Sequence, residues 1–121
     1  MIFEIKDYAG ILVKLSEETW QTKAGNGLPG NHPEIHEYLV EFQSTIESPD
    51  LVFESTRDER SQAFYRLAGG RGDFIGKHLV VIVKYVMEAT GLCGYVSTFY
   101  LSRSVYAKGR LLWKKTDNIA N

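Results

Sequence analysis

The residues best suited to chemistry in this sequence are two histidines in the stretch GNHPEIHEY, residues 30–38. His32 and His36 are four residues apart, a spacing that places two side chains on one face of a helix. That spacing suits a pair of metal ligands, whereas a single imidazole can instead transfer protons near neutral pH. A structural role, with one ring capping the helix and the other packing, is the third possibility. The position of His32 between a Gly-rich loop and a helix makes it the better functional candidate.

A zinc protease is a poor fit to these histidines. In HPEIH the glutamate occupies the third position, whereas the HExxH motif requires it in the second, beside the metal-bound water. The chain has one further histidine, His78, and a single cysteine, Cys93. No carboxylate cluster completes a ligand set, so we predict neither a metal nor a cofactor.

A second group of polar residues interrupts apolar stretches in the C-terminal half. Lys84 stands within LVVIVKYV, and Thr98 and Tyr100 share the parity of Val96 within GYVSTFYLS. Side chains alternate between the two faces of a strand. We predict one sheet face that carries Lys84, Thr98, Tyr100 and, from AFYRL, Arg66. Such a face is either ordinary surface with basic side chains lying along it or a shallow cleft for a phosphodiester.

Two further basic residues lie in a charged segment. Arg57 and Arg60 belong to STRDERS, residues 55–61, which is typical of a hairpin tip. Such residues are usually solvated, but Arg57 lies just beyond the end of a predicted strand and can bind a phosphate bidentately from there. The segment GGRGDFIGKH, residues 69–78, is predicted to be a hairpin loop. It is not a P-loop, because its spacing is one residue too long and a strand follows it.

The surrounding pattern predicts the elements that position these side chains. Ser16 suits an N-cap for a first helix over 17–23. A second helix is predicted from Pro33 to just before Pro49, because Ile35, Leu39, Phe42 and Ile46 recur at helical spacing. Strands are predicted over 11–15, 50–55, 61–68, 79–86, 94–102 and 109–115. The expected fold is α+β, with two N-terminal helices packed on a four- to five-stranded antiparallel sheet.

Composition limits the class of protein. The chain has 121 residues, of which 44% are hydrophobic and 24% charged, and a net charge of −1. We expect one soluble domain over 1–121, with a core of about residues 11–113 and a frayed tail over 116–121. The near-neutral charge means that any contact with nucleic acid is local. The sequence shows no signal-peptide or membrane-spanning pattern, so we expect a cytoplasmic protein without membrane contact.

The order of several short motifs resembles a known family. The chain reads SEETWQ, NHPEI, FQSTIESPDLVFES, RDERSQAFYRL, HLVVIVKYV, GYVSTFYLS and KGRLLW. This succession, over residues 11–113, resembles the phage- and toxin-associated domains of the barnase–EndoU–colicin–RelE-like (BECR) nuclease superfold. Those domains share an HPE segment, a helix ending in a TI…PD turn, and strands reading FY, VVVK and TAYL. Two positions depart from the pattern: Asn31 replaces a basic residue, and Phe99 replaces a small one.

The resemblance implies a metal-independent endoribonuclease, acting on tRNA or mRNA as a toxin or phage effector. The ribose 2′-OH would attack the adjacent phosphate and leave a cyclic phosphate. His32 would be the general acid or base, and Arg57 would stabilise charge on the phosphate. Thr98 and Tyr100 would position the phosphate or transfer a proton. The expected substrate contacts are Lys84, Arg66, Arg60 and His36.

An inactive binding module of the same fold is the alternative function. It would serve as an inhibitor, a nucleic-acid adaptor or a protein-partner domain, and the near-neutral charge and Phe99 favour it. A toxin would also need an antitoxin or immunity protein as a partner. The oligomeric state stays open, because the terminal RLLW can pair across a dimer or close the edge of its own sheet.

Overall fold

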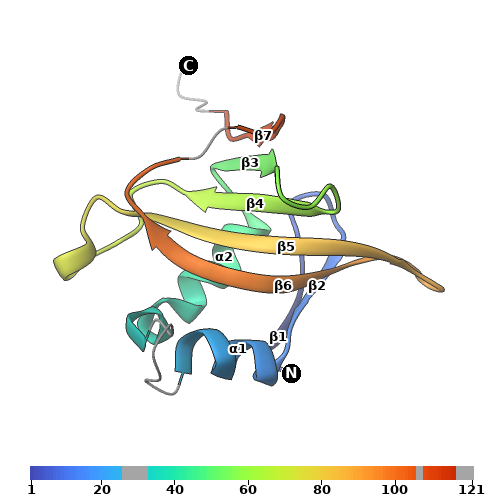
Figure 1. Ribbon diagram of the computed structural model, residues 1–121, viewed down its shortest axis with the longest axis horizontal. Helices are drawn as coiled ribbons and strands as arrows, with labels where there is room; N and C mark the ends of the chain where they lie inside the picture. The colour runs from blue at the N-terminus through green and yellow to red at the C-terminus, as the bar shows by residue number, and fades with distance from the viewer. Residues whose placement is uncertain (26–32, 106–107, 117–121) are drawn as a thin grey trace.

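The computed structural model describes residues 1–25, 33–105 and 108–116, and their arrangement confirms the α+β class (Figure 1). Seven strands form one sheet in the order β1-β2-β6-β5-β4-β3-β7. The strands are β1 (Phe3–Lys6), β2 (Leu12–Leu15), β3 (Leu51–Glu54), β4 (Ser61–Arg66), β5 (His78–Glu88), β6 (Gly91–Ser102) and β7 (Leu111–Lys114). The helical segments are α1 (Glu17–Trp20), η1 (Gln21–Gly25), η2 (Pro33–Tyr38), α2 (Leu39–Glu47) and η3 (Gly72–Phe74).

The sheet is larger than predicted and is not purely antiparallel. The sequence missed β1, which pairs with β2 in a hairpin ahead of the first helix. β2 then pairs with β6 in the parallel direction, with Val13 opposite Gly94 and Lys14 opposite Tyr95. The expectation of two helices preceding four or five antiparallel strands is therefore wrong. The parallel contact joins segments about 80 residues apart, and local patterns carry no signal for such a pairing.

The predicted helices form, although each is divided into two types of turn. Ser16 caps α1, because its hydroxyl accepts a hydrogen bond from the Thr19 N–H at 3.0 Å. The second helical stretch begins at Pro33 as the 3₁₀ segment η2 and ends at Glu47, ahead of Pro49. No helix in the described parts of the chain is long and apolar enough to span a membrane.

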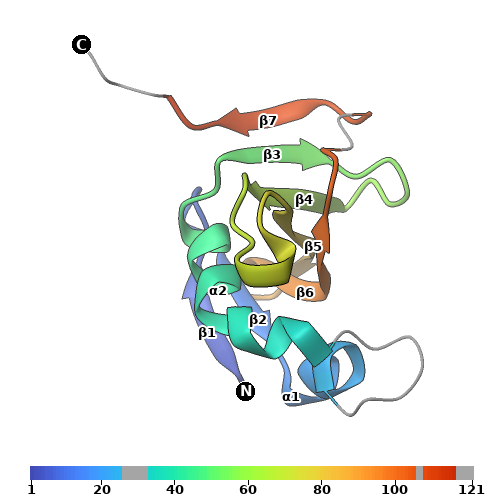
Figure 2. The same ribbon diagram turned by 90° about the vertical axis from the view of Figure 1, so that its left-hand side faces the viewer.

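The helices lie on one face of the sheet, and the main core forms between them and the side chains on that face, including those of β1 and β2 (Figure 2). Phe42 from α2 is buried there against Phe99, with ring centroids 5.1 Å apart. The opposite face carries a smaller cluster: Phe53, Ala63, Tyr65 and Val80. Val105, from the segment that runs from β6 towards β3, packs on this cluster. The far face is thus only partly covered.

A buried carboxylate fixes the β1–β2 hairpin. Asp7 is 6% exposed, and its side chain accepts hydrogen bonds from the N–H groups of Ala9 and Ile11 at 2.8 and 2.9 Å. The hydroxyl of Tyr85, on β5, donates to the same carboxylate at 2.6 Å. This contact ties the hairpin to the middle of the sheet and holds β2 beside β6.

Candidate functional site

Three predicted site residues lie on the face of the sheet that the helices leave uncovered. The register of β5 and β6 places Val80 opposite Tyr100 and Ile82 opposite Thr98. Residues directly opposite each other in a sheet point to the same face, and Lys84 follows Ile82 at a spacing of two. Lys84, Thr98 and Tyr100 therefore share one face, as the sequence predicted.

A β-bulge changes which neighbours these residues have. The register shifts after Ile82, so that Val83 pairs with Val96 and Lys84 with Tyr95, leaving Ser97 as the extra residue on β6. Val96 consequently belongs to the helix-side core, and Tyr95 lies beside Lys84 with its hydroxyl bonded to the Glu88 carboxylate. Strand parity alone assigned Val96 to the face of Thr98, which is wrong. An extra residue inverts the alternation, and no turn residue marks its position.

The β3–β4 turn brings further cations to Lys84. The Nζ of Lys84 lies 3.6 Å from Oδ2 of Asp58, and the Nε of Arg60 lies 3.8 Å from Oδ1. The backbone N–H of Arg60 donates to Oδ1 at 3.0 Å. This hydrogen bond, followed by the charge of Lys84, holds the pKa of Asp58 below its usual value. Asp58 is therefore ionised at neutral pH and holds both cations close together, while Arg57 lies exposed on the same turn.

These residues form what we call the Lys84 surface, defined as Arg60, Lys84, Tyr95 and Thr98, with Tyr100 at its border. It combines cationic side chains with hydroxyl groups and one half-exposed aromatic ring. Cationic and hydroxyl side chains suit an anionic oxygen ligand such as a phosphodiester, and an aromatic face suits a base. Tyr95 is the member that sequence analysis missed, because the bulge moved it here.

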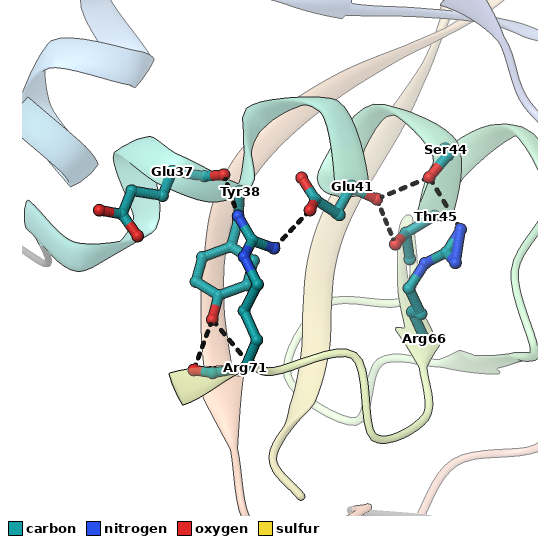
Figure 3. A network of polar contacts seen from close by, with 7 residues as sticks. All are labelled: Glu37, Tyr38, Glu41, Ser44, Thr45, Arg66 and Arg71. Atoms are coloured by element: carbon teal, nitrogen blue, oxygen red, sulfur yellow. Dashed lines mark hydrogen bonds and ion pairs between the residues drawn. The ribbon is translucent and has the colours of Figure 1, made fainter. Parts of the chain in front are cut away.

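Arg66 does not belong to this surface, which corrects the sequence prediction. It lies opposite Leu79, whose side chain is buried in the helix-side core. Its guanidinium donates from Nη2 to the Ser44 hydroxyl of α2 at 2.9 Å (Figure 3). Parity within one strand says which residues alternate, but only the register between strands says which sets share a face.

His36 is also separated from the hydroxyl pair. The His36 ring lies 5.2 Å from the Trp20 ring, which stacks on Phe99 at 5.1 Å. Phe99 stands between Thr98 and Tyr100 on β6, so its side chain points to the opposite face. His36 therefore lies on the helix side of the sheet, away from the Lys84 surface. His32 lies outside the described residues.

A second polar cluster, on the helix side, is structural rather than a free binding site. Arg71 donates from Nη2 to the Glu37 carbonyl at 2.8 Å, forms an ion pair with Glu41, and lies 4.3 Å over the Tyr38 ring (Figure 3). The Tyr38 hydroxyl accepts from the Arg71 N–H at 3.0 Å. A hollow of about 470 Å³ adjoins this cluster. Because its guanidinium is engaged by these contacts, Arg71 ties the 69–77 loop to the start of α2.

Comparisons with known proteins add no family to this picture. No model of a protein family, no curated protein and no solved structure matches the chain. Within residues 1–25, 33–105 and 108–116, no group of three or more His, Cys, Asp or Glu side chains is placed to hold a metal ion. The site must therefore be interpreted from its own geometry.

Proposed function

We propose that this chain is a metal-independent endoribonuclease that binds RNA on the Lys84 surface. The observation that supports this most directly is the gathering of predicted residues from three separate segments. Lys84 on β5, Thr98 and Tyr100 on β6, and Arg60 of the β3–β4 turn come together on the uncovered face. The resemblance to BECR nucleases predicts a phosphate site from the same residues.

The proposed reaction needs little more than positioning and proton transfer. The 2′-oxygen loses its proton to a base and forms a bond to the adjacent phosphorus, while the bond to the 5′-oxygen breaks and that oxygen takes a proton. Lys84 and Arg57 would stabilise the charge that builds on the phosphate oxygens, and Thr98 would orient them. His32 would exchange the protons, as the resemblance implies.

A binding module without catalysis is the second candidate. The observation that favours it is the placement of His36 on the helix side, with Trp20 and Phe99 between it and the opposite face. If no imidazole reaches Thr98, the chain would keep the RNA-binding surface and lose the reaction.

The two candidates separate in one experiment. Purified protein is incubated with total RNA in EDTA, and the products are examined for cyclic phosphate ends. We expect cleavage by the wild type, and rates about 100-fold to 10,000-fold lower for His32→Ala, because a positioned acid or base contributes that much. Thr98→Val, which removes the hydroxyl at nearly constant volume, should also slow cleavage.

A matched control variant and a binding measurement distinguish the possible outcomes. His36→Ala removes the same side chain from the opposite face and should leave the rate unchanged. RNA that is bound, as measured by fluorescence anisotropy, but intact would support the binding module instead. RNA neither bound nor cleaved by folded protein would contradict both candidates, and activity lost only in EDTA would indicate a metal-dependent reaction.

A further inference from the structure

The sheet has an open edge at β7, independent of the Lys84 surface. β7 is the last strand in the sheet order of the described residues, and Figure 2 shows it outermost, beyond β3. The Lys115 N–H donates to the Asp50 carbonyl at 2.9 Å, so it points towards β3. Backbone groups alternate in direction along a strand, so the N–H and carbonyl of Lys114 point outwards. No bond to either group is found within the described part of the chain, so they can pair with a further strand.

The segment that contains β7 carries concentrated charge of one sign. The stretch KGRLLWKK, residues 108–115, contains four basic residues and no acidic one, in a chain of net charge −1. Arg110 forms an ion pair with Glu54, whereas the side chains of Lys114 and Lys115 are exposed. Lysines often protect edge strands from pairing, but they also attract a strand that carries carboxylates.

Apolar surface accompanies the charge. Leu111 and Trp113 are 46% and 41% exposed, which is high for large apolar side chains. A hollow of about 310 Å³ lies beside the strand, lined by Asp50, Leu51, Leu67, Lys114 and Lys115. Lys114 is the register partner of Leu51, so a residue paired to the outer side of Lys114 would point to the face of this hollow.

We propose that the outer edge of β7 binds an extended acidic segment of another protein by strand addition. Backbone hydrogen bonds to Lys114 would supply affinity, and carboxylates facing Lys114 and Lys115 would supply specificity. A second copy of this chain fits less well, because two β7 strands would bring the same basic flanks together, and like charges on paired strands are destabilising. This proposal does not depend on RNA cleavage.

The test uses a capped octapeptide of alternating glutamate and valine as the probe, added to the full chain. Backbone amide NMR should show a shift and slower hydrogen exchange at Lys114, since its N–H gains a partner. A lysine–valine octapeptide should leave that amide unchanged. If the lysine peptide binds equally well, or if a single-stranded RNA octamer shifts the same amide more strongly, the acidic-peptide proposal is wrong. Slow exchange at Lys114 without peptide, with a dimer in sedimentation, would assign the edge to a second copy.

Variants at one position separate backbone from charge. Lys114→Pro removes the outward N–H but leaves the bonds to β3. It should lower the affinity for the glutamate–valine peptide about tenfold. Lys114→Ala removes the same charge and keeps the N–H, so its affinity for the peptide should fall only about twofold to threefold. Equal affinity of the proline variant and the wild type would contradict strand addition. The double variant Lys114→Glu/Lys115→Glu tests the charge without introducing a proline into the strand. It should bind the lysine–valine peptide more tightly than the glutamate–valine peptide. A variant that still prefers the glutamate–valine peptide would contradict the charge argument.

Discussion

At the scale of single residues, the buried pair of Tyr85 and Asp7 has the clearest energetic consequence. The phenol donates to the carboxylate at 2.6 Å, and Tyr85 is 6% exposed. Burial first, and then the hydrogen bond to Asp7, raise the pKa of Tyr85 far above its ordinary value of 10.0. The folded state therefore keeps a proton that the unfolded chain loses above that pH. The stability from this contact is fully present below pH 10 and declines as the pH rises further.

Tyr85→Phe should accordingly have a pH-dependent cost. At about pH 7 the variant should lose about 1–3 kcal/mol in the free energy of unfolding, because a buried carboxylate oxygen loses its donor. Above pH 10 the wild type loses stability that the variant never had, so the difference should narrow by up to about 1.4 kcal/mol per pH unit. Urea unfolding of the wild type and the variant, at pH 7 and at a pH above 10, measures this difference in the free energy of unfolding. If the difference is the same at both pH values, the stability would not depend on the proton that Tyr85 shares with Asp7.

At the scale of elements, the junction of β2 with β6 depends on a glycine. A methyl group on Gly94 would lie 2.8 Å from Val83 Cγ1, 2.9 Å from Tyr85 Cε1 and 3.0 Å from Val13 Cγ2. Two of these atoms belong to β5 and the third to β2, so the space is closed from both sides. The parallel pairing of β2 with β6 therefore requires the absence of a side chain at this position.

Gly94→Ala should destabilise the protein by about 1–3 kcal/mol, because overpacking of a filled core forces its neighbours apart. Thermal unfolding measures the loss. Ser97→Ala, on an exposed position of the same strand, is the control and should change the melting temperature much less. An unchanged melting temperature for Gly94→Ala would mean that β2 does not pack on β6 as described.

At the scale of the whole molecule, charge distribution would decide how RNA is bound at the proposed site. The net charge is −1, and the Lys84 surface contributes two cations, Arg60 and Lys84, with Arg57 exposed on the adjoining β3–β4 turn. Attraction at long range is therefore weak, and the contact must be made locally at short range. Each phosphate that is neutralised releases counterions, so the number of contacts is measurable from the salt dependence.

RNA affinity should depend only moderately on salt. For three phosphate contacts with a single strand, a plot of the logarithm of affinity against the logarithm of salt concentration should have a slope of about −2. Lys84→Met should reduce the magnitude of that slope by about 0.7, while His36→Ala should not change it. Fluorescence anisotropy across a salt series provides both numbers. A far steeper slope would place the RNA on a larger basic surface than this one.

Much of the local structure could be predicted from the sequence. Ser16 and Pro33 mark helix starts, Pro49 follows a helix end, and Ile35, Phe42 and Ile46 are buried as their spacing indicates. The strands corresponding to β2 through β7 were also expected, including the terminal edge strand, with boundaries a few residues off. These features depend on interactions between residues close in sequence, which is why local patterns report them.

The residues of the candidate site could be grouped only partly from the sequence, because local patterns do not report contacts between strands. Lys84, Thr98 and Tyr100 were placed together correctly because β5 and β6 are adjacent and regular at that point. Arg66 was placed on the wrong face, and Tyr95 was missed, because the first depends on the register of β4 with β5 and the second on a bulge. Neither the register nor the bulge has a signature within a single strand.

The sequence by itself determined the class of fold, the helix limits, most strands and the chemical types available for a site. The tertiary structure decided the parallel joining of β2 to β6, the face on which each strand presents its polar residues, and the open edge at β7. The physical reason is that alternation and helical spacing arise from backbone geometry over a few residues. Register, strand order and the covering of a face arise instead from packing between segments that are distant along the chain.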